Sequence, residues 1–397
     1  MSEIRVTNVI GENGSSPVNF TQGINMSGIV TATSFVPTVG QLSHRNVIIN
    51  GDAKISQRAT SQGSITSGGY YAVDRWYVTM DTAGTWTMYQ DSDVPSGYGF
   101  SKSVSLDVNT ANTSLSAGSR AMLSYRLEGQ DVQRFCKGTA NAKKYALSFW
   151  VKCGKTGTYV LELFDHDNSR HICKTYTISS ANTWEQKKLI FDNETSNPFG
   201  NDNGKSLELQ FYLAAGSNFT SGTLATSWAS NTNANRAVGQ VNVADSTSNK
   251  YFLTGVQLEV GPVATPFEHK SDQEELLRCY RYYYKMGKLD YKGTHMAANE
   301  VYGIGMSDND NTNIYCQINF PVPMREPPST LDQAGASNYN VRRDTTQTCT
   351  GNPSLTSGSE FSFRVNFPKS SHGWGTGQML WCMSAGSSSY LGFSAEL

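Results

Sequence analysis

The sequence has little charge and no long run of either sign, and this excludes several classes of function. Charged residues make up 16% of the 397 residues, well below the roughly 25% of an average globular protein. Lys and Arg together number 32 against 33 Asp and Glu, and basic residues cluster only in pairs such as Lys143-Lys144. Nucleic-acid binding draws on clustered positive charge, so we expect no nucleic-acid partner.

The sequence also lacks the signals of membrane, secreted and metal-binding proteins. No apolar run approaches the about 20 residues of a membrane helix, so no membrane insertion is expected. Residues 1–10 lack the basic and apolar segments of a signal peptide, which predicts synthesis in the cytoplasm. The cysteines number seven, with no Cys-x-x-Cys pair, and predict neither a disulfide framework nor a zinc site. We expect no metal and no cofactor.

Small polar and aromatic residues take the place of the missing charge. Gly alone occurs 36 times and aromatics reach 11%, a composition typical of short strands joined by polar turns rather than of disorder. Residues 206–213 alternate strictly, with Leu207, Leu209 and Phe211 on one side, and 145–151 and 252–260 alternate in the same way. This predicts an all-β fold, with a sandwich or jelly roll over 41–270 whose sheets have one buried and one wet face.

Residues 1–40 differ from the rest because their apolar residues are sparse and separated by glycines. Such a segment cannot bury a core of its own, so it is either a flexible tail or an arm that orders against a partner. As an anchoring arm it would bind through its apolar side chains, which are Ile4, Val6, Val9, Ile10 and Phe20.

A helix and a second β domain follow the sandwich. Ser271 and Glu274 have capping-box spacing, which predicts a connecting helix over 271–287, packed either on the sandwich or against copies of itself. Phe361, Phe363 and Val365 then alternate with polar residues. We therefore predict a smaller C-terminal β tip domain over 288–397.

Polar clusters give little sign of catalysis. Asp165-His166-Asp167, with His171 nearby, follows a predicted strand and is interpreted as a turn, ahead of a metal site or a catalytic role. Glycosidases need two carboxylates held together in space. Four carboxylates on predicted strands could meet that need, and these are Asp74, Asp107, Glu162 and Glu208. Their positions are explained equally well by a solvated strand face.

Aromatic residues are the better guide to binding. Trp76 and Trp86 are predicted to belong to the core. Trp374 lies in the glycine-rich loop 370–377 beside His372, where an indole suits contact with a ligand or another subunit. With two strand residues added, the candidate receptor or glycan contacts are Trp374, His372, Trp381 and Tyr390.

Several stretches resemble fibre-like virion proteins of tailed bacteriophages, notably those that infect cyanobacteria. The N-terminal arm resembles theirs at 5–9 and 27–35. Borders of a carbohydrate-binding-module-like jelly roll are matched by Asn46-Val47-Ile48-Ile49-Asn50-Gly51-Asp52, by Ala72-Val73-Asp74-Arg75-Trp76 and by Val256-Gln257-Leu258-Glu259-Val260-Gly261. The segment 320–328 and the terminal 393–397 resemble the tip of such fibres.

The resemblance implies a homotrimeric virion subunit, and the weak signs of catalysis predict that it has no enzymatic activity. Its N-terminus would bind other virion structural proteins on the tail, neck or capsid, and its outer domain would contact host cell-surface polysaccharide. One alternative is a purely structural decoration or neck or capsid fibre that binds no receptor. A polysaccharide depolymerase is the weaker alternative, because it would normally need a long repetitive β-helix with paired carboxylates.

Overall fold

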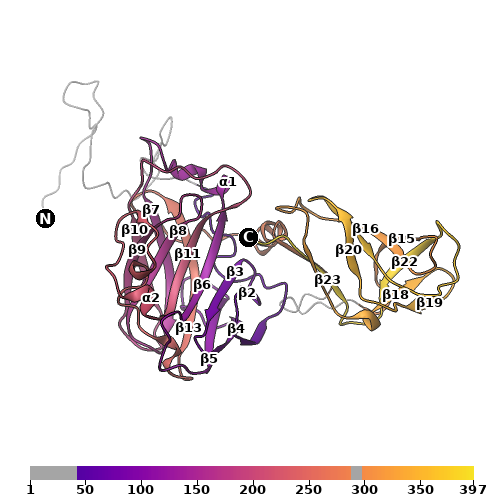
Figure 1. Cartoon of the computed structure of the whole chain (residues 1–397), viewed down its shortest axis with the longest axis horizontal. Helices are drawn as coiled ribbons and strands as arrows, with labels where there is room; N and C mark the ends of the chain where they lie inside the picture. Colours follow the sequence, from indigo (N-terminus) through magenta and orange to yellow (C-terminus); the bar gives the residue numbers. More distant parts are fainter. Residues whose placement is uncertain (1–42, 288–296) are drawn as a thin grey trace, which may run out of the picture. The chain divides into compact units, whose positions relative to one another are not determined.

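The computed structural model describes residues 43–287 and 297–397 (Figure 1). The proposed anchoring residues Ile4, Val6, Val9, Ile10 and Phe20 lie outside the described residues. The described chain is almost entirely β-structure in antiparallel sheets, which confirms the predicted fold class. No described helix is long and apolar enough to cross a membrane.

Two antiparallel sheets form the large sandwich (Figure 1). The first has six strands in the order β1 (Ser61–Ile65), β4 (Thr85–Asp91), β5 (Ser103–Thr110), β13 (Lys250–Val260), β7 (Tyr145–Cys153) and β10 (Glu185–Phe191). The second has seven, in the order β12 (Ala229–Ser230), β9 (Arg170–Ile178), β8 (Gly157–Asp165), β11 (Lys205–Ala215), β6 (Arg120–Glu128), β3 (Trp76–Asp81) and β2 (Gly69–Tyr70).

The sandwich encloses the main hydrophobic core. Leu207, Leu209 and Phe211 point into it from β11, as their alternation predicts. Trp76 and Trp86 are 1% and 0% exposed, which confirms the prediction that they are core residues.

The expectation of a wet outer face is wrong for much of β11. The side chains that alternate with the apolar ones are also buried, with Glu208 3%, Gln210 5% and Tyr212 0% exposed. Tyr212 is covered by the segment 216–241, which carries α2 (Ser217–Thr220) and the 3₁₀ turn η2 (Asn233–Asn235). Phe219 and Ala237 of that segment pack on outward-facing sheet residues. Glu208 and Gln210 are instead buried by the side chains that bind them, namely Arg126, His166 and Arg236.

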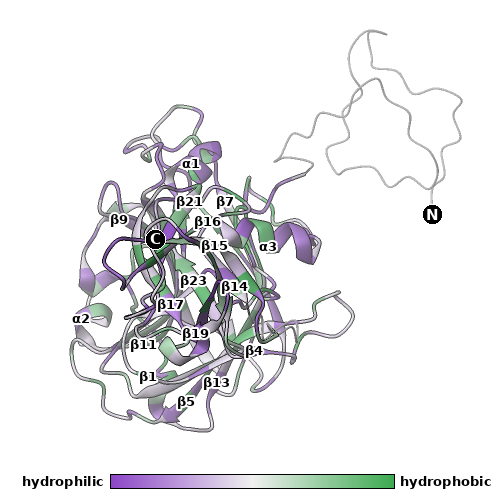
Figure 2. Ribbon diagram, turned by 90° about the vertical axis from the view of Figure 1, so that its right-hand side faces the viewer, coloured by the Kyte–Doolittle hydropathy of each residue, from purple (hydrophilic) through white to green (hydrophobic). Residues whose placement is uncertain are grey.

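The predicted connecting helix is real but shorter than expected. In α3 (Asp272–Tyr280) the Ser271 hydroxyl accepts from the Glu274 amide at 3.1 Å, and hydrophilic and hydrophobic residues both occur along the helix (Figure 2). Cys279 belongs to the main core, so the helix packs on the sandwich. The prediction that it extends to 287 is wrong: β14 (Tyr283–Gly287) pairs with β23 (Tyr390–Ser394), because long-range pairing overrides the local pattern there.

The C-terminal part of the chain builds two further sheets. The larger has the order β19 (Thr346–Thr348), β18 (Tyr339–Arg342), β22 (Met379–Ser384), β15 (Val301–Ser307), β16 (Ile314–Asn319), β21 (Ser362–Asn366) and β20 (Ser354–Gly358). The smaller has the order β14, β23 and β17 (Thr330–Gln333). A second, separate hydrophobic core lies here and includes Phe363, Val365 and Phe393.

Short helical turns complete the described chain, and the last residues bind the sandwich. The turns are α1 (Gly129–Val132), η1 (Gln133–Phe135), η3 (Val243–Asp245) and η5 (Ala336–Asn338). Glu396 forms ion pairs with the buried Arg75 at 2.7 Å and with Arg58 at 3.2 Å. Tyr70 donates a hydrogen bond to the Leu397 carbonyl at 3.1 Å. These contacts fix the C-terminal residues against the second sheet.

Candidate functional site

A cleft of about 340 Å³ opens on the outer face of the seven-stranded sandwich sheet. Strand register explains why its side chains gather. Tyr77 of β3 pairs with Ser124 of β6, which pairs with Gln210 of β11. One row along, Arg126 pairs with Glu208, and Glu208 pairs with Phe164. The lining residues are Gly68, Tyr77, Thr79, Asp81, Arg120, Met122, Arg126, Phe164, His166, Glu208, Gln210 and Arg236.

The cover over part of the sheet creates the cleft. Phe219, Ala225 and Ala237 pack against outward-facing residues of β6, β8, β9 and β11 and close that part of the face. Arg236 belongs to the same segment and lines the cleft. The cleft is therefore the part of the face that the segment 216–241 leaves open.

Glu208 is held ionised at the centre of the cleft. His166 Nε2 lies 2.7 Å from one carboxylate oxygen, and Arg126 Nε donates to the other at 3.3 Å. Burial opposes ionisation, but the hydrogen bond with His166 and the charges of Arg126, His166 and Lys205 together outweigh it and lower the pKa of Glu208 to about 2. The carboxylate is thus a fixed hydrogen-bond acceptor rather than an acid.

Arg236 is held by a buried carboxylate beneath the cover. Its Nε and Nη2 bind Glu162 at 2.9 to 3.1 Å, and Nη2 also donates to Gln210 at 2.8 Å. His171 Nδ1 lies 2.6 Å from a Glu162 oxygen, and the Tyr212 hydroxyl donates a hydrogen bond to the other Glu162 oxygen at 3.1 Å. This network fixes the guanidinium in place.

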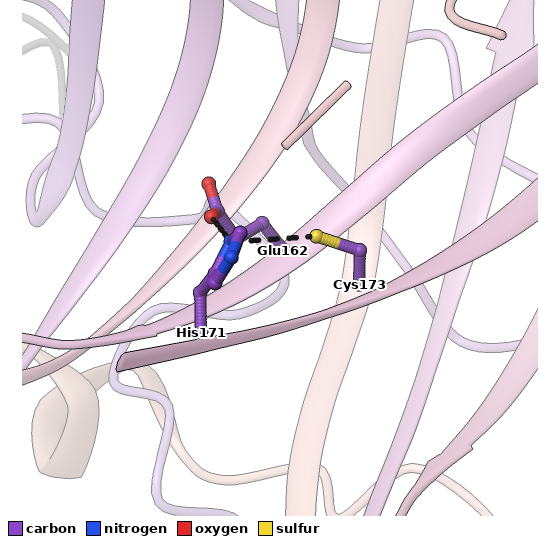
Figure 3. Close-up of side chains that lie close together, drawn as sticks. All are labelled: Glu162, His171 and Cys173. Carbon is purple, nitrogen blue, oxygen red and sulfur yellow. Dashed lines mark hydrogen bonds and ion pairs between the residues drawn. The ribbon is translucent and has the colours of Figure 1, made fainter. Parts of the chain in front are cut away.

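Glu162, His171 and Cys173 also form a compact group of the kind that binds metal ions (Figure 3). Their arrangement is better explained as part of the arginine network. Both Glu162 oxygens already accept from Arg236, and the Cys173 thiol donates to the Arg236 carbonyl at 3.3 Å. A cation beside the guanidinium would meet its repulsion.

Two aromatic rings lie among these polar groups. The Arg126 guanidinium stands 3.6 Å from the centre of the Tyr77 ring, and that of Arg236 stands 4.9 Å from the Phe164 ring. The buried Ser124 hydroxyl lies in the same row as Tyr77, without a hydrogen-bond partner among the described residues. The cleft therefore combines ring surfaces with donors and acceptors in fixed positions.

The charges of the cleft are balanced in pairs. Arg126 pairs with Glu208, Arg236 with Glu162, and Arg120 with Asp81 at 2.8 Å. Such a surface offers hydrogen bonds in several directions without a net field. It suits an uncharged ligand that is rich in hydroxyl groups.

A larger hollow, of about 660 Å³, lies beside α3 and offers less for recognition. Its tyrosine, Tyr282, is 1% exposed and donates its hydroxyl hydrogen bond to Glu128 at 2.5 Å. No other Phe, Tyr or Trp among the described residues lines this hollow, so it presents no exposed aromatic ring. We therefore place the candidate site in the smaller cleft.

The residues predicted from sequence as receptor contacts are divided between different places. His372 is 3% exposed and stacks on Trp374 with ring centres 5.4 Å apart. Trp374 is half-buried and packs against the second core. Trp381 is 47% exposed on the outer face of β22. Tyr390 is half-buried in β23 beneath the Lys285 ammonium.

The polar clusters also have definite places. The predicted turn after Asp165 is confirmed, between β8 and β9. Asp74 is buried and accepts a hydrogen bond from Gln57, and Asp107 pairs with Lys250 on the other sheet. Glu208 lines the cleft, and Glu162 binds Arg236, which also lines it. Sequence analysis missed Arg236, for which no local signal exists. The alternation along β11 did place Glu208 and Gln210 together on one face of the sheet, although it did not identify that face as a site.

The sequence matches no known protein family and no curated protein. Among solved structures the chain is similar to the enzymatically active domain of tailspike protein 4 of bacteriophage CBA120, with 15% identity, a TM-score of 0.29 and coverage of 54% of this chain. It spans only 21% of that tailspike chain.

Sugar-binding proteins occur among the similar structures too. A putative sugar binding protein from Bacteroides thetaiotaomicron matches with 12% identity and a TM-score of 0.31, over 54% of this chain and 100% of that one. The family 11 carbohydrate-binding module from Clostridium thermocellum matches with 11% identity and a TM-score of 0.26, over 53% and 99%. These TM-scores are low, and the similarities carry no conclusion about the function of this chain.

Proposed function

We propose that this chain is a non-enzymatic fibre or adhesin subunit that binds neutral glycans in the cleft of its sandwich. The observation that carries the proposal is the combination of the half-buried Tyr77 ring with the fixed polar groups of Arg126, Glu208 and Arg236. Sugar rings have apolar faces that stack on aromatic rings, and edges of hydroxyl groups that both donate and accept hydrogen bonds. The cleft offers both kinds of contact.

The absence of catalysis is part of the proposal and is supported by the carboxylates. A glycosidase needs one carboxylic acid with a raised pKa to protonate the leaving group. The pKa of Glu208 is instead lowered to about 2. Glu162 is occupied by Arg236, His171 and Tyr212. Each carboxylate therefore holds a neighbouring side chain in position.

The place of the chain in a phage virion is also proposed. The resemblance of its arm, jelly-roll borders and tip to fibre-like virion proteins supports a homotrimer, with residues 1–40 bound to other virion proteins and the rest of the chain, including the cleft, facing host polysaccharide. Immunogold labelling of intact particles should find the protein on the tail, neck or capsid. A protein found only in the infected cell would contradict this role.

Glycan binding is tested with Tyr77→Ala on an array of neutral oligosaccharides, followed by calorimetry on the best ligand. Loss of a stacking ring should weaken binding about ten- to hundredfold. Tyr77→Phe keeps the ring and should bind nearly as the unmodified chain does. Tyr98→Ala is the matched control, since Tyr98 is 54% exposed and its ring lies against Trp150 of the other sheet, with ring centres 4.3 Å apart.

The same assay separates the alternatives. If the unmodified chain binds no glycan on the array or on host cells, a purely structural decoration protein is favoured. If incubation with host polysaccharide releases new reducing ends, the chain is a depolymerase. If Tyr77→Ala binds normally, glycans are bound elsewhere and the cleft is not the site.

A further inference from the structure

The outer face of the large C-terminal sheet carries exposed apolar side chains where polar ones are expected. Ile304, Met306, Met379 and Trp381 are 55%, 54%, 64% and 47% exposed on its outer face. Register makes them neighbours: Ile304 pairs with Trp381, and Met306 with Met379, across β15 and β22. The opposite face of the sheet already contains the second core. We call these four residues the apolar patch.

The size and composition of the apolar patch are those of a protein interface. Four large side chains, each about half exposed, present roughly 400 Å² of apolar surface. A stable interface covers about 800 Å² per partner, of which slightly more than half is apolar. Met, Trp, Tyr and Arg are enriched at such interfaces. The apolar patch would therefore form the centre of one interface of ordinary size.

Two arginines stand on opposite sides of the apolar patch. Arg342 pairs with Trp381 across β18 and β22, and its guanidinium lies 5.6 Å from the indole. Arg364 of β21 lies 4.6 Å from the Tyr315 ring. Four strand spacings separate β18 from β21, or about 19 Å. Neither arginine has an ion-pair partner within the described chain, in contrast to Arg343, which pairs with Asp344 at 3.4 Å.

Acidic residues lie at the same rim. Asp308 follows β15 directly and lines the same surface hollow as Met306 and Arg364. Asp310 is exposed in the turn that leads to β16. The rim thus presents both signs of charge around an apolar centre. Around a three-fold axis, the arginines of one copy can lie against the aspartates of the next copy.

We infer that the apolar patch is the contact between copies of this chain. This inference rests on the homo-oligomer proposed above and identifies the surface that joins its subunits. A second copy supplies what the surface lacks, namely an apolar face for Ile304, Met306 and Met379, and carboxylates for Arg342 and Arg364. A glycan would leave the aliphatic side chains without suitable contacts, since sugars stack on rings and bond to polar groups.

Light scattering of the full chain, with and without Met379→Lys, tests the inference. A charge at the centre of an interface costs at least about 2 kcal/mol, so the dissociation constant should rise about thirtyfold or more. Trp381→Ser is a second variant, without added charge, and should weaken association in the same direction. Met379 and Trp381 are 64% and 47% exposed in the single chain, so far-UV circular dichroism should show an unchanged fold.

Phe361→Lys is the matched control, because Phe361 is 58% exposed and lies outside the apolar patch. The inference stands if the unmodified chain and this control are oligomers while both patch variants dissociate. If all four proteins keep the same mass, the chain is an oligomer through another surface and the inference falls. If the unmodified chain is a 43.5 kDa monomer at micromolar concentration, the homo-oligomer falls as well, whereas the glycan assay of the cleft is unaffected.

Discussion

The stability of the sandwich depends on whether Glu208, a residue of the cleft, is protonated. Its pKa is about 2 in the folded chain against 4.5 ordinarily, so its stabilisation is present above pH 4.5 and is lost as the pH falls towards 2. The shift corresponds to about 3 kcal/mol. Glu208→Gln should therefore flatten the dependence of unfolding free energy on pH between 4.5 and 2, measured by urea denaturation. Glu274→Gln changes an exposed carboxylate and should keep the slope.

Arg236 is expected to matter far more than another arginine of the same cleft. Arg236→Met leaves Glu162 charged and buried at 0% exposure, which should cost about 3–5 kcal/mol of unfolding free energy. Arg120→Met breaks an ion pair whose members are 24% and 46% exposed, and should cost at most about 1 kcal/mol. Chemical denaturation of both variants gives the comparison. Similar losses would mean that the buried network does not hold the cover.

Trp374 links the predicted receptor loop to packing. Because the indole is half-buried against the second core and stacks on His372, Trp374→Ala should lower the unfolding free energy by about 2–4 kcal/mol. Its effect on glycan binding should be small if the cleft is the site. A variant of unchanged stability that binds host cells poorly would instead make Trp374 a receptor contact, as its position in the sequence suggested.

Gly51 shows a constraint at the scale of one element. The segment leading into the sandwich passes so close to β13 that a Cβ on Gly51 would lie 2.2 Å from the backbone oxygen of Val256. A backbone oxygen within a sheet cannot move aside, so Gly51→Ala should cost about 1–3 kcal/mol. Gly375→Ala is the control, with nothing within 4 Å of its Cβ. Thermal denaturation should separate the two variants clearly.

Strand β14 shows how tertiary contacts decide the identity of an element. The sequence predicts helix through 287, and the helical spacing of Leu276, Cys279 and Tyr283 supports it. In the folded chain, 283–287 pairs with 390–394, more than one hundred residues away. The local sequence does not contain that partner strand, so it cannot predict the pairing. The helix therefore ends at Tyr280, shortly before the strand pairing starts at Tyr283.

At the scale of the whole molecule, residues 1–40 are predicted to serve attachment and not folding. The described residues form two large hydrophobic cores, one in the sandwich and one in the C-terminal part of the chain. A truncation that begins at Gln41 should stay soluble and keep the oligomeric state of the full chain, yet fail to enter virions. Sedimentation and particle incorporation measure the two parts. Aggregation of the truncated chain would place the arm in the fold.

The sequence by itself determines the fold class and the content of the cores. Alternation along 206–213 places Leu207, Leu209 and Phe211 inside, and the Ser271 cap begins the helix where expected. Both signals are local: a two-residue period follows from the geometry of a strand, and a cap needs only the next three residues.

Only the tertiary structure decides which polar residues act together. Arg236 lies 74 residues from Glu162, and the apolar patch joins β15 to β22 across a gap of similar length. Sequence analysis interpreted the polar face of β11 as solvated, because nothing local announces the segment and the side chains that cover it. A binding site depends on distances between side chains in space, and those distances are set when strands far apart in the chain take their places in one sheet.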